Sequence, residues 1–165
     1  RPRLRTHTDI PVDADAELPD VNVDDRQIAQ ALVILLNNAL DATSGTPSRV
    51  LLRVRKNTSI LGALPNNDRP LATIRFEVID DGPGISAANL GRIFDPFFTT
   101  KTSGTGLGLS IAQQIVSENG ARLEVESNPG GRTAFSIVLP VDPLERAGEK
   151  VGVQSDIRSS PAFRS

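Results

Sequence analysis

The chain has 165 residues, of which 18 are Lys or Arg and 20 are Asp or Glu, so its formal net charge is −2. That length suits one domain with a proper core, and the balanced charge gives no overall positive field for nucleic acid or an anionic membrane. The sequence contains no cysteine, which excludes disulfides, thiolate metal sites and cysteine nucleophiles, and its single histidine, His7, argues against a multi-histidine metal site. No apolar run approaches the roughly 20 residues of a membrane helix, and the start lacks the apolar segment of a signal peptide.

The polar start of the chain precedes its clearest helix. We expect a short strand near residues 3–10 and a loop after it. An amphipathic helix is predicted over residues 24–42, because Asp24 is a good N-cap and Gln27, three residues later, completes a capping-box pattern. Its apolar stripe repeats at steps of three and four: Ile28, Ala31, Leu32, Leu35, Leu36, Ala39 and Leu40. Since the chain begins with Arg1 and contains no methionine, we also expect it to be a piece of a longer protein.

Two strands are predicted after this helix, joined by a loop over residues 56–70. In the first, residues 49–55, apolar and basic residues alternate, which is typical of a strand with one buried face. We expect its arginines on the solvated face: Arg49, Arg53 and Arg55. In the second, residues 72–80, Asp80 has the same parity as the apolar residues, so its carboxylate is predicted to face the apolar side, where it needs a partner.

The remaining predicted elements are shorter. Ser86 can cap a short helix that reaches about residue 92, and a long loop is expected over residues 94–106. A second amphipathic helix is predicted over residues 107–119, with the apolar residues Ile111, Ala112, Ile115 and Val116. Strands over residues 123–127 and 132–139 flank a hairpin turn. This order favours an α/β fold, a two-layer α/β sandwich in which helices cover one face of a mixed, mostly antiparallel sheet.

Polar groups at two places are candidates for ligand binding, and each also has a plain structural interpretation. Ile34, Asn38 and Asp41 lie along one line of the first helix, at the edge of its apolar stripe. Asn38 is either an ordinary residue near a helix end or an oxygen ligand for a hard cation. Residues 80–84, Asp-Asp-Gly-Pro-Gly, are either an acidic tight turn or a purine site, where Asp80 accepts from an exocyclic amine and the glycines let the backbone approach a flat ring.

Two further segments indicate phosphate binding. Residues 104–109 hold three glycines before a helix, so they offer free backbone N–H groups and the positive end of the helix dipole to an anion. They match neither a Walker A loop, in which Lys and Ser or Thr follow the last glycine, nor a dinucleotide fingerprint, which follows a strand directly. Residues 93–101 hold three phenylalanines within five residues, and form either a loop anchored in the core or the hinge of a mobile lid that brings Lys101 to a polyphosphate.

Together and in this order, the four segments resemble the ATP-binding catalytic domain of bacterial sensor histidine kinases, within the Bergerat-fold group that includes gyrase B, MutL and the heat-shock chaperone ATPases. QALVILLNNALDA, residues 30–42, matches the N box, and residues 80–84 match the G1 box. IFDPFFTTK, residues 93–101, matches the F box, and GTGLGLSIA, residues 104–112, matches the G2 box. The resemblance covers roughly residues 5–140.

The resemblance implies a histidine kinase-like ATPase domain over residues 1–140 that binds ATP with Mg²⁺ and transfers the γ-phosphoryl group to a histidine. Asn38 would coordinate the Mg²⁺ that bridges the phosphates, with Asp41 beside it, and Asp80 would bind the adenine amine. Residues 95–105 would form the ATP lid and bring Lys101, the one candidate for a catalytic charge, near the phosphates. The other ATP-binding residues implied are Gly82 and Gly84 in the adenine pocket, Thr133 through a water, and Gly104, Thr105, Gly106, Leu107 and Gly108 at the phosphates.

The histidine that accepts the phosphoryl group would lie outside this chain, because His7 falls in an expected strand and not in a dimerisation helix. It would belong to an upstream dimerisation domain of the same full-length protein, and the phosphoryl group would pass to the receiver domain of a response regulator. The resemblance further implies a cytoplasmic domain of a homodimer that can be anchored in the inner membrane, with no contact of its own to membrane or nucleic acid. The fragment itself would be a monomer, with residues 141–165 as a tail or linker.

Residue 34 departs from the family's pattern. Histidine kinases often carry another asparagine four residues before the Mg²⁺ asparagine, and here Ile34 stands at that position. Isoleucine cannot hydrogen-bond to phosphate or metal-bound water, so a catalytically weakened, nucleotide-binding regulatory module is the alternative interpretation. An ATP-driven clamp of the gyrase or MutL type is disfavoured, because it needs a transducer domain after the last strands and the polar tail does not resemble one.

Overall fold

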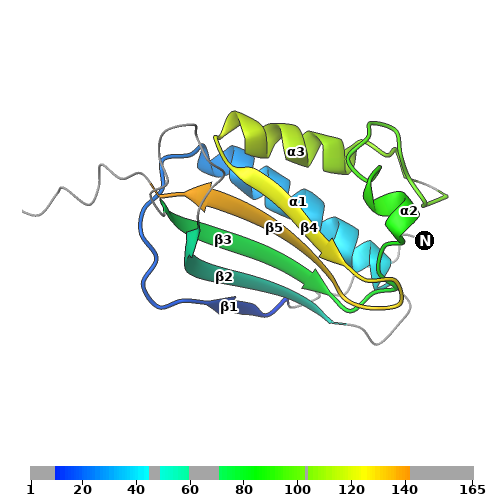
Figure 1. Cartoon of the computed structure of the whole chain (residues 1–165), viewed down its shortest axis with the longest axis horizontal. Helices are drawn as coiled ribbons and strands as arrows, with labels where there is room; N and C mark the ends of the chain where they lie inside the picture. Colours follow the sequence, from blue (N-terminus) through cyan, green and yellow to red (C-terminus); the bar gives the residue numbers. More distant parts are fainter. Residues whose placement is uncertain (1–9, 45–48, 60–70, 103, 142–165) are drawn as a thin grey trace, which may run out of the picture.

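The computed structural model describes residues 10–44, 49–59, 71–102 and 104–141. Its sheet has five strands in the order β1-β2-β3-β5-β4: β1 (Val12–Ala14), β2 (Val50–Ser59), β3 (Leu71–Asp80), β4 (Arg122–Ser127) and β5 (Thr133–Pro140). β1 is parallel to β2, and the other pairs are antiparallel. Helices α1 (Asp25–Ala42) and α3 (Gly108–Glu118) lie side by side on one face of the sheet, and the short α2 (Ala87–Leu90) lies at one end (Figure 1). The predicted two-layer sandwich with a mixed, mostly antiparallel sheet is therefore confirmed.

Apolar side chains between the sheet and the helices form the core. Leu35 of α1, Val116 of α3 and Ile137 of β5 are each fully buried there. β5 is buried along almost its whole length, because it lies between β3 and β4 and beneath the helices. The apolar stripes predicted for the two helices thus meet one sheet face, and removing that surface from water stabilises the pairing of the layers.

One side chain of α3 deviates from the predicted stripe. Ala112, Ile115 and Val116 are buried as expected, whereas Ile111 remains 41% exposed. Residue 111 is one position before residue 112, so it lies about 100° around the helix from the buried line. Ile111 therefore presents an apolar side chain on the outer surface.

Within the described residues, no helix is long and apolar enough to cross a membrane.

The start of α1 is capped partly by a residue that the sequence did not indicate. Asp24 is the N-cap, as predicted, and its carboxylate accepts from the backbone N–H groups of Arg26 and Gln27 at 3.0 and 3.1 Å. The predicted return bond from Gln27 is wrong, because the Asp24 N–H donates to Asn119 Oδ1 at 2.8 Å instead. Asn119 Nδ2 in turn donates to Gln27 Oε1 at 2.8 Å. Since Asn119 is the C-cap of α3, this side chain joins the start of one helix to the end of the other.

The strands at the β1 edge differ from the prediction in extent. Most of the strand expected near residues 3–10 falls outside the described residues, and β1 begins only at Val12. β2 continues to Ser59, four residues into the expected loop, because its second half pairs with β3. A partner strand thus extends β2 beyond the alternating segment that was visible in its own sequence.

Two of the arginines expected on a solvated face form ion pairs there. Arg53 Nε and Arg55 Nη2 lie 3.4 and 2.5 Å from Asp13 Oδ2 of β1, and Arg53 Nη1 lies 3.7 Å from Glu77 Oε2 of β3. Both arginines are half-buried, whereas Arg49 is exposed as expected. The guanidinium of Arg55 also holds the pKa of Asp13 below its ordinary value. On β1, β2 and β3, the sheet face opposite the helices therefore carries paired charges.

Candidate nucleotide-binding site

The predicted site residues come from segments that meet at one end of the molecule. α1 and β3 end there, α3 begins there, and the segment between α2 and α3 lies beside them, on the right in Figure 1. The fold thus brings together four sequence motifs that are separated along the chain.

Asp80 is the last residue of β3 and is only 3% exposed, which confirms that its carboxylate faces inward. Its Oδ1 atom accepts from the Gly82 backbone N–H at 2.9 Å, which supplies the partner that a buried carboxylate needs. Burial raises the pKa of Asp80, the Gly82 hydrogen bond lowers it, and the charge of Asp81 raises it further. A Cβ at Gly82 would lie 2.6 Å from Asp80 Oδ1 and 3.3 Å from Ala42 Cβ, so glycine lets this turn pass between the carboxylate and the end of α1.

Gly84 holds the same turn against the β4–β5 hairpin. Its φ of +73° is in the left-handed region, and a Cβ there would overlap the backbone carbonyl of Asn128. The Gly130 N–H donates to the Pro83 carbonyl at 2.7 Å, which closes the contact from the other side. The glycines of this motif therefore serve close backbone packing.

Thr133 lies directly opposite Asp80 in the β3–β5 register and is buried. Its Oγ1 atom is 2.8 Å from Ser127 Oγ, and Ser127 Oγ also accepts from the Ile85 N–H at 2.9 Å. No motif in the sequence pointed to Ser127. Its place at the end of a predicted strand was visible, but its pairing with Thr133 depends on the hairpin register.

Asn38, Asp41 and Lys101 meet between α1 and the segment predicted to be the lid. Lys101 Nζ donates to Asn38 Oδ1 at 3.2 Å and to Asp41 Oδ2 at 2.9 Å. Ala42, which borders the Asp80 turn, is four residues after Asn38, so about one helical turn separates the two places. An amide oxygen and a carboxylate oxygen thus converge on one positive charge near the buried Asp80.

A strained turn shapes the predicted lid. Phe97 has a φ of +67°, which is rare for a residue with a large side chain, and the residue is 75% exposed. Its N–H donates to the Gly106 carbonyl at 2.9 Å, and a Cβ at Gly106 would overlap the Phe97 backbone. At Gly104, an added Cβ would lie 2.5 Å from Thr99 Oγ1. The glycines at 104 and 106 therefore let the two ends of this loop pack together.

The first turn of α3 is the place where phosphate binding was predicted. The first N–H groups of a helix have no partner within the helix, so they can face an anion. Thr105 Oγ1 accepts from the Leu107 N–H at 3.4 Å. A Cβ at Gly108 would lie 3.3 Å from Ile34 Cγ2, so the unusual isoleucine of α1 approaches the start of α3. Ile34 thus presents an apolar group where the family pattern has an amide.

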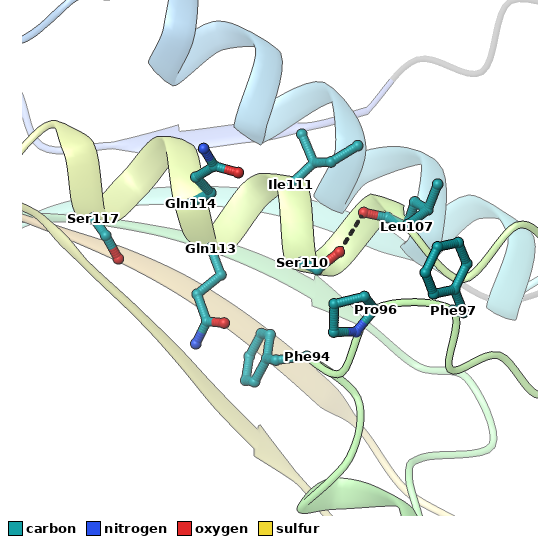
Figure 2. Close-up of a pocket in the computed structure, with 9 residues that line it drawn as sticks. All are labelled: Phe94, Pro96, Phe97, Leu107, Ser110, Ile111, Gln113, Gln114 and Ser117. Carbon is teal, nitrogen blue, oxygen red and sulfur yellow. Dashed lines mark hydrogen bonds between the residues drawn. The ribbon is translucent and has the colours of Figure 1, made fainter.

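A pocket of about 540 Å³ lies on the outer side of α3, and it includes Phe97 of the predicted lid and Leu107 at the start of α3. Figure 2 shows Pro96, Phe97 and Leu107 at the start of α3, with Phe94 and the glutamines farther along the helix. The residues that line this pocket carry no charge, and of the residues predicted to bind ATP only Leu107 is among them. We name it the uncharged pocket, and its exposed large apolar side chains are Phe97 and Ile111.

Comparison with known proteins identifies the class. The profile of the family described as "Histidine kinase-, DNA gyrase B-, and HSP90-like ATPase" matches residues 23–143. The chain belongs to this family and is an ATPase catalytic domain of the histidine kinase type. This confirms the predicted family and fold, whereas the roles of the individual site residues stay predictions.

The similar proteins include curated sensor kinases and solved catalytic domains. The chain is 40% identical over 139 residues to the sensory histidine kinase/phosphatase NtrB of Rhodobacter capsulatus, covering 84% of this chain and 39% of that protein. It is 34% identical over 140 residues to the histidine-protein kinase AtoS of Escherichia coli, covering 85% and 21%. The catalytic domain of histidine kinase ThkA superposes with a TM-score of 0.64 at 31% identity, covering 84% and 82%. The chain thus spans well under half the length of these curated relatives.

Proposed function

We propose that this domain binds Mg–ATP between α1, the Asp80 turn and residues 95–105, and supplies the γ-phosphoryl group to a histidine of the full-length protein. The observation that carries the proposal is the buried carboxylate of Asp80, 3% exposed, at the end of a strand and beside the last turn of α1. A buried ionisable group with a raised pKa at such a place is typical of a ligand site. Full-length ShkA in complex with AMPPNP, a solved structure with a TM-score of 0.62 and 28% identity over 79% of this chain, supports a nucleotide as the ligand.

The residues around Asn38 fit a magnesium ion. Mg²⁺ prefers oxygen ligands, and the oxygens of Asn38 and Asp41 both contact the single positive charge of Lys101. In the proposed complex, Asn38 and Asp41 hold the ion, which neutralises phosphate charge. The first N–H groups of α3 and the Lys101 ammonium stabilise the negative charge that remains.

On this proposal the domain acts by positioning and charge stabilisation. Asp80 fixes the purine, the start of α3 orients the phosphates, and residues 95–105 exclude water from the reacting group. The nucleophile and the base that activates it belong to the domain that bears the histidine. Binding of Mg–ATP to the 165-residue chain by calorimetry tests the first half of the proposal, and no binding would refute it.

We infer that the histidine-bearing domain docks on the uncharged pocket. Phe97 is held outward by a positive φ, and an exposed aromatic ring on an uncharged surface is typical of a protein-binding site. The surface adjoins the predicted lid, so a domain docked there is next to the phosphates. The chain covers 39% of its NtrB relative, and in the proposed full-length protein the histidine-bearing domain lies outside the part that this chain represents.

We expect Phe97→Ala to lower phosphoryl transfer about tenfold. The docked domain would bury the Phe97 ring, and aromatic residues at the centre of an interface contribute most to its affinity. The measurement uses the chain extended upstream through the histidine-bearing domain, with γ-³²P-ATP and an assay for acid-labile label. Mg–ATP affinity of the 165-residue chain should stay the same. Val33→Ala, which shortens an apolar side chain exposed on α1, is the control and should leave transfer unchanged. Equal transfer in both variants would contradict this docking surface.

The alternative function, a regulatory module with weakened catalysis, depends on Ile34. We expect Ile34→Asn to strengthen Mg–ATP binding about tenfold, because the amide adds a hydrogen bond to a charged ligand beside the start of α3. Ile34→Val is the matched control, since it removes a methylene group without adding a polar group. An extended wild-type chain that binds Mg–ATP but acquires no acid-labile label would favour the regulatory module. Unchanged affinity in Ile34→Asn would show that the missing amide is not limiting.

A further inference from the structure

Lys101 connects the predicted lid to α1 by its side chain. Its ammonium donates to Asn38 Oδ1 and Asp41 Oδ2, which lie 63 and 60 residues earlier in the chain. Its backbone is held locally, since its N–H donates to Thr99 Oγ1 at 3.1 Å and its carbonyl accepts from the Gly104 N–H at 3.3 Å. A compact turn thus points one positive charge at two oxygens of another element.

The same two oxygens are the ones that fit Mg²⁺. An ammonium and a divalent cation repel each other, so both cannot bind Asn38 Oδ1 at the same time. The ion pair with Asp41 is solvent-exposed, with side-chain exposures of 41% for Lys101 and 56% for Asp41. Exposed pairs are weak, so another cation can displace the lysine at little cost.

We propose that the Lys101 ammonium and the Mg²⁺ of Mg–ATP are alternative occupants of the Asn38–Asp41 oxygen pair. Binding of Mg–ATP then exchanges one cation for the other and frees the turn that carries Lys101 from α1. The released ammonium remains close to the phosphates, so lid movement and nucleotide binding are coupled. Asp41 thus holds the lysine of the lid before Mg–ATP binds and contacts the Mg²⁺ afterwards. The proposal rests on the proposed function only for the identity of the incoming cation.

The lid contact is tested by amide hydrogen exchange in the 165-residue chain without nucleotide. In NaCl, Lys101→Met and Asp41→Asn should each raise exchange at residues 99–102 about two- to fivefold, as expected for loss of an exposed ion pair. MgCl₂ at matched ionic strength should raise exchange in the wild type and cause no further rise in Lys101→Met. Lys56→Met, which removes an exposed lysine from β2, is the control and should behave like the wild type. Equal lid exchange in all the variants would overturn the proposal.

Competition for the oxygens is tested with Mn²⁺ alone, followed by paramagnetic broadening of the Asn38 side-chain amide signal. Lys101→Met should raise the apparent Mn²⁺ affinity about two- to fivefold, because the competing charge is gone. Asp41→Asn should not raise it, because that change also removes a negative ligand. Unchanged affinity in Lys101→Met would overturn the competition. Because neither experiment contains ATP, a chain that binds Mg–ATP normally but fails both would refute the exchange and leave the proposed function standing.

Discussion

Asp80→Asn is expected to lower the affinity of the chain for Mg–ATP by about ten- to a hundredfold. The carboxylate is the proposed acceptor for the purine amine. A neutral amide oxygen accepts a weaker hydrogen bond, and the amide can also turn its NH₂ group, a donor, towards the amine, which is itself a donor. Isothermal titration of the variant with Mg–ATP measures the loss. Asp81→Asn is the matched control, because Asp81 is the adjacent carboxylate and is exposed. Affinities equal to that of the wild type in both variants would remove Asp80 from its proposed role.

The same substitution should not destabilise the fold. Burial raises the pKa of Asp80, so the folded chain holds this proton more tightly than the unfolded chain does. As pH rises from the ordinary carboxyl pKa towards the raised one, the free energy of unfolding falls, and it levels off above the raised pKa. The amide of the Asp80→Asn variant does not titrate, so the variant should lack this fall. Thermal unfolding between about pH 4 and pH 7 should therefore show a variant at least as stable as the wild type at neutral pH.

Gly84→Ala is expected to lower the free energy of unfolding by about 3 kcal/mol, the largest stability effect that we predict. Two costs add at this position. The φ of +73° is unfavourable for any residue with a Cβ, and the new Cβ would overlap the Asn128 carbonyl. Relieving that overlap would push the Asp80 turn away from the hairpin, so Mg–ATP affinity should fall as well. Urea unfolding measures the first effect and calorimetry the second.

Two other glycines separate these costs. Gly130 has a φ of +73°, and a Cβ added there would meet no atom within 4 Å, so Gly130→Ala should cost about 1 kcal/mol from backbone strain alone. Gly91 has a φ of −72° and is equally unobstructed, so Gly91→Ala should be neutral or slightly stabilising. If Gly84→Ala cost no more than Gly130→Ala, the hairpin would have to yield to the added methyl group.

The sequence predicted those features that depend on local periodicity. Steps of three and four residues located α1 and α3 to within a residue or two. The two-residue repeat of β3 predicted that Asp80 faces inward, and its low exposure confirms this. Family resemblance grouped the four motifs as one site, and the fold brings their segments to one end of the molecule.

Contacts between distant segments were beyond such patterns. The bond from Asp24 to Asn119 spans 95 residues, and that from Lys101 to Asn38 spans 63. Each donor already had a local interpretation from the sequence: the Asp24 N–H was expected to bond to Gln27 in a capping box, and Lys101 was expected to bind phosphate. Periodicity describes which way a side chain points from its own helix or strand, and it carries no information about which side chain of another element meets it. By itself, therefore, the sequence determined the two long helices, the inward face of β3 and the family. Only the tertiary structure decided that Lys101 lies on the Asn38–Asp41 oxygens, because that meeting depends on how α1 and the lid segment pack.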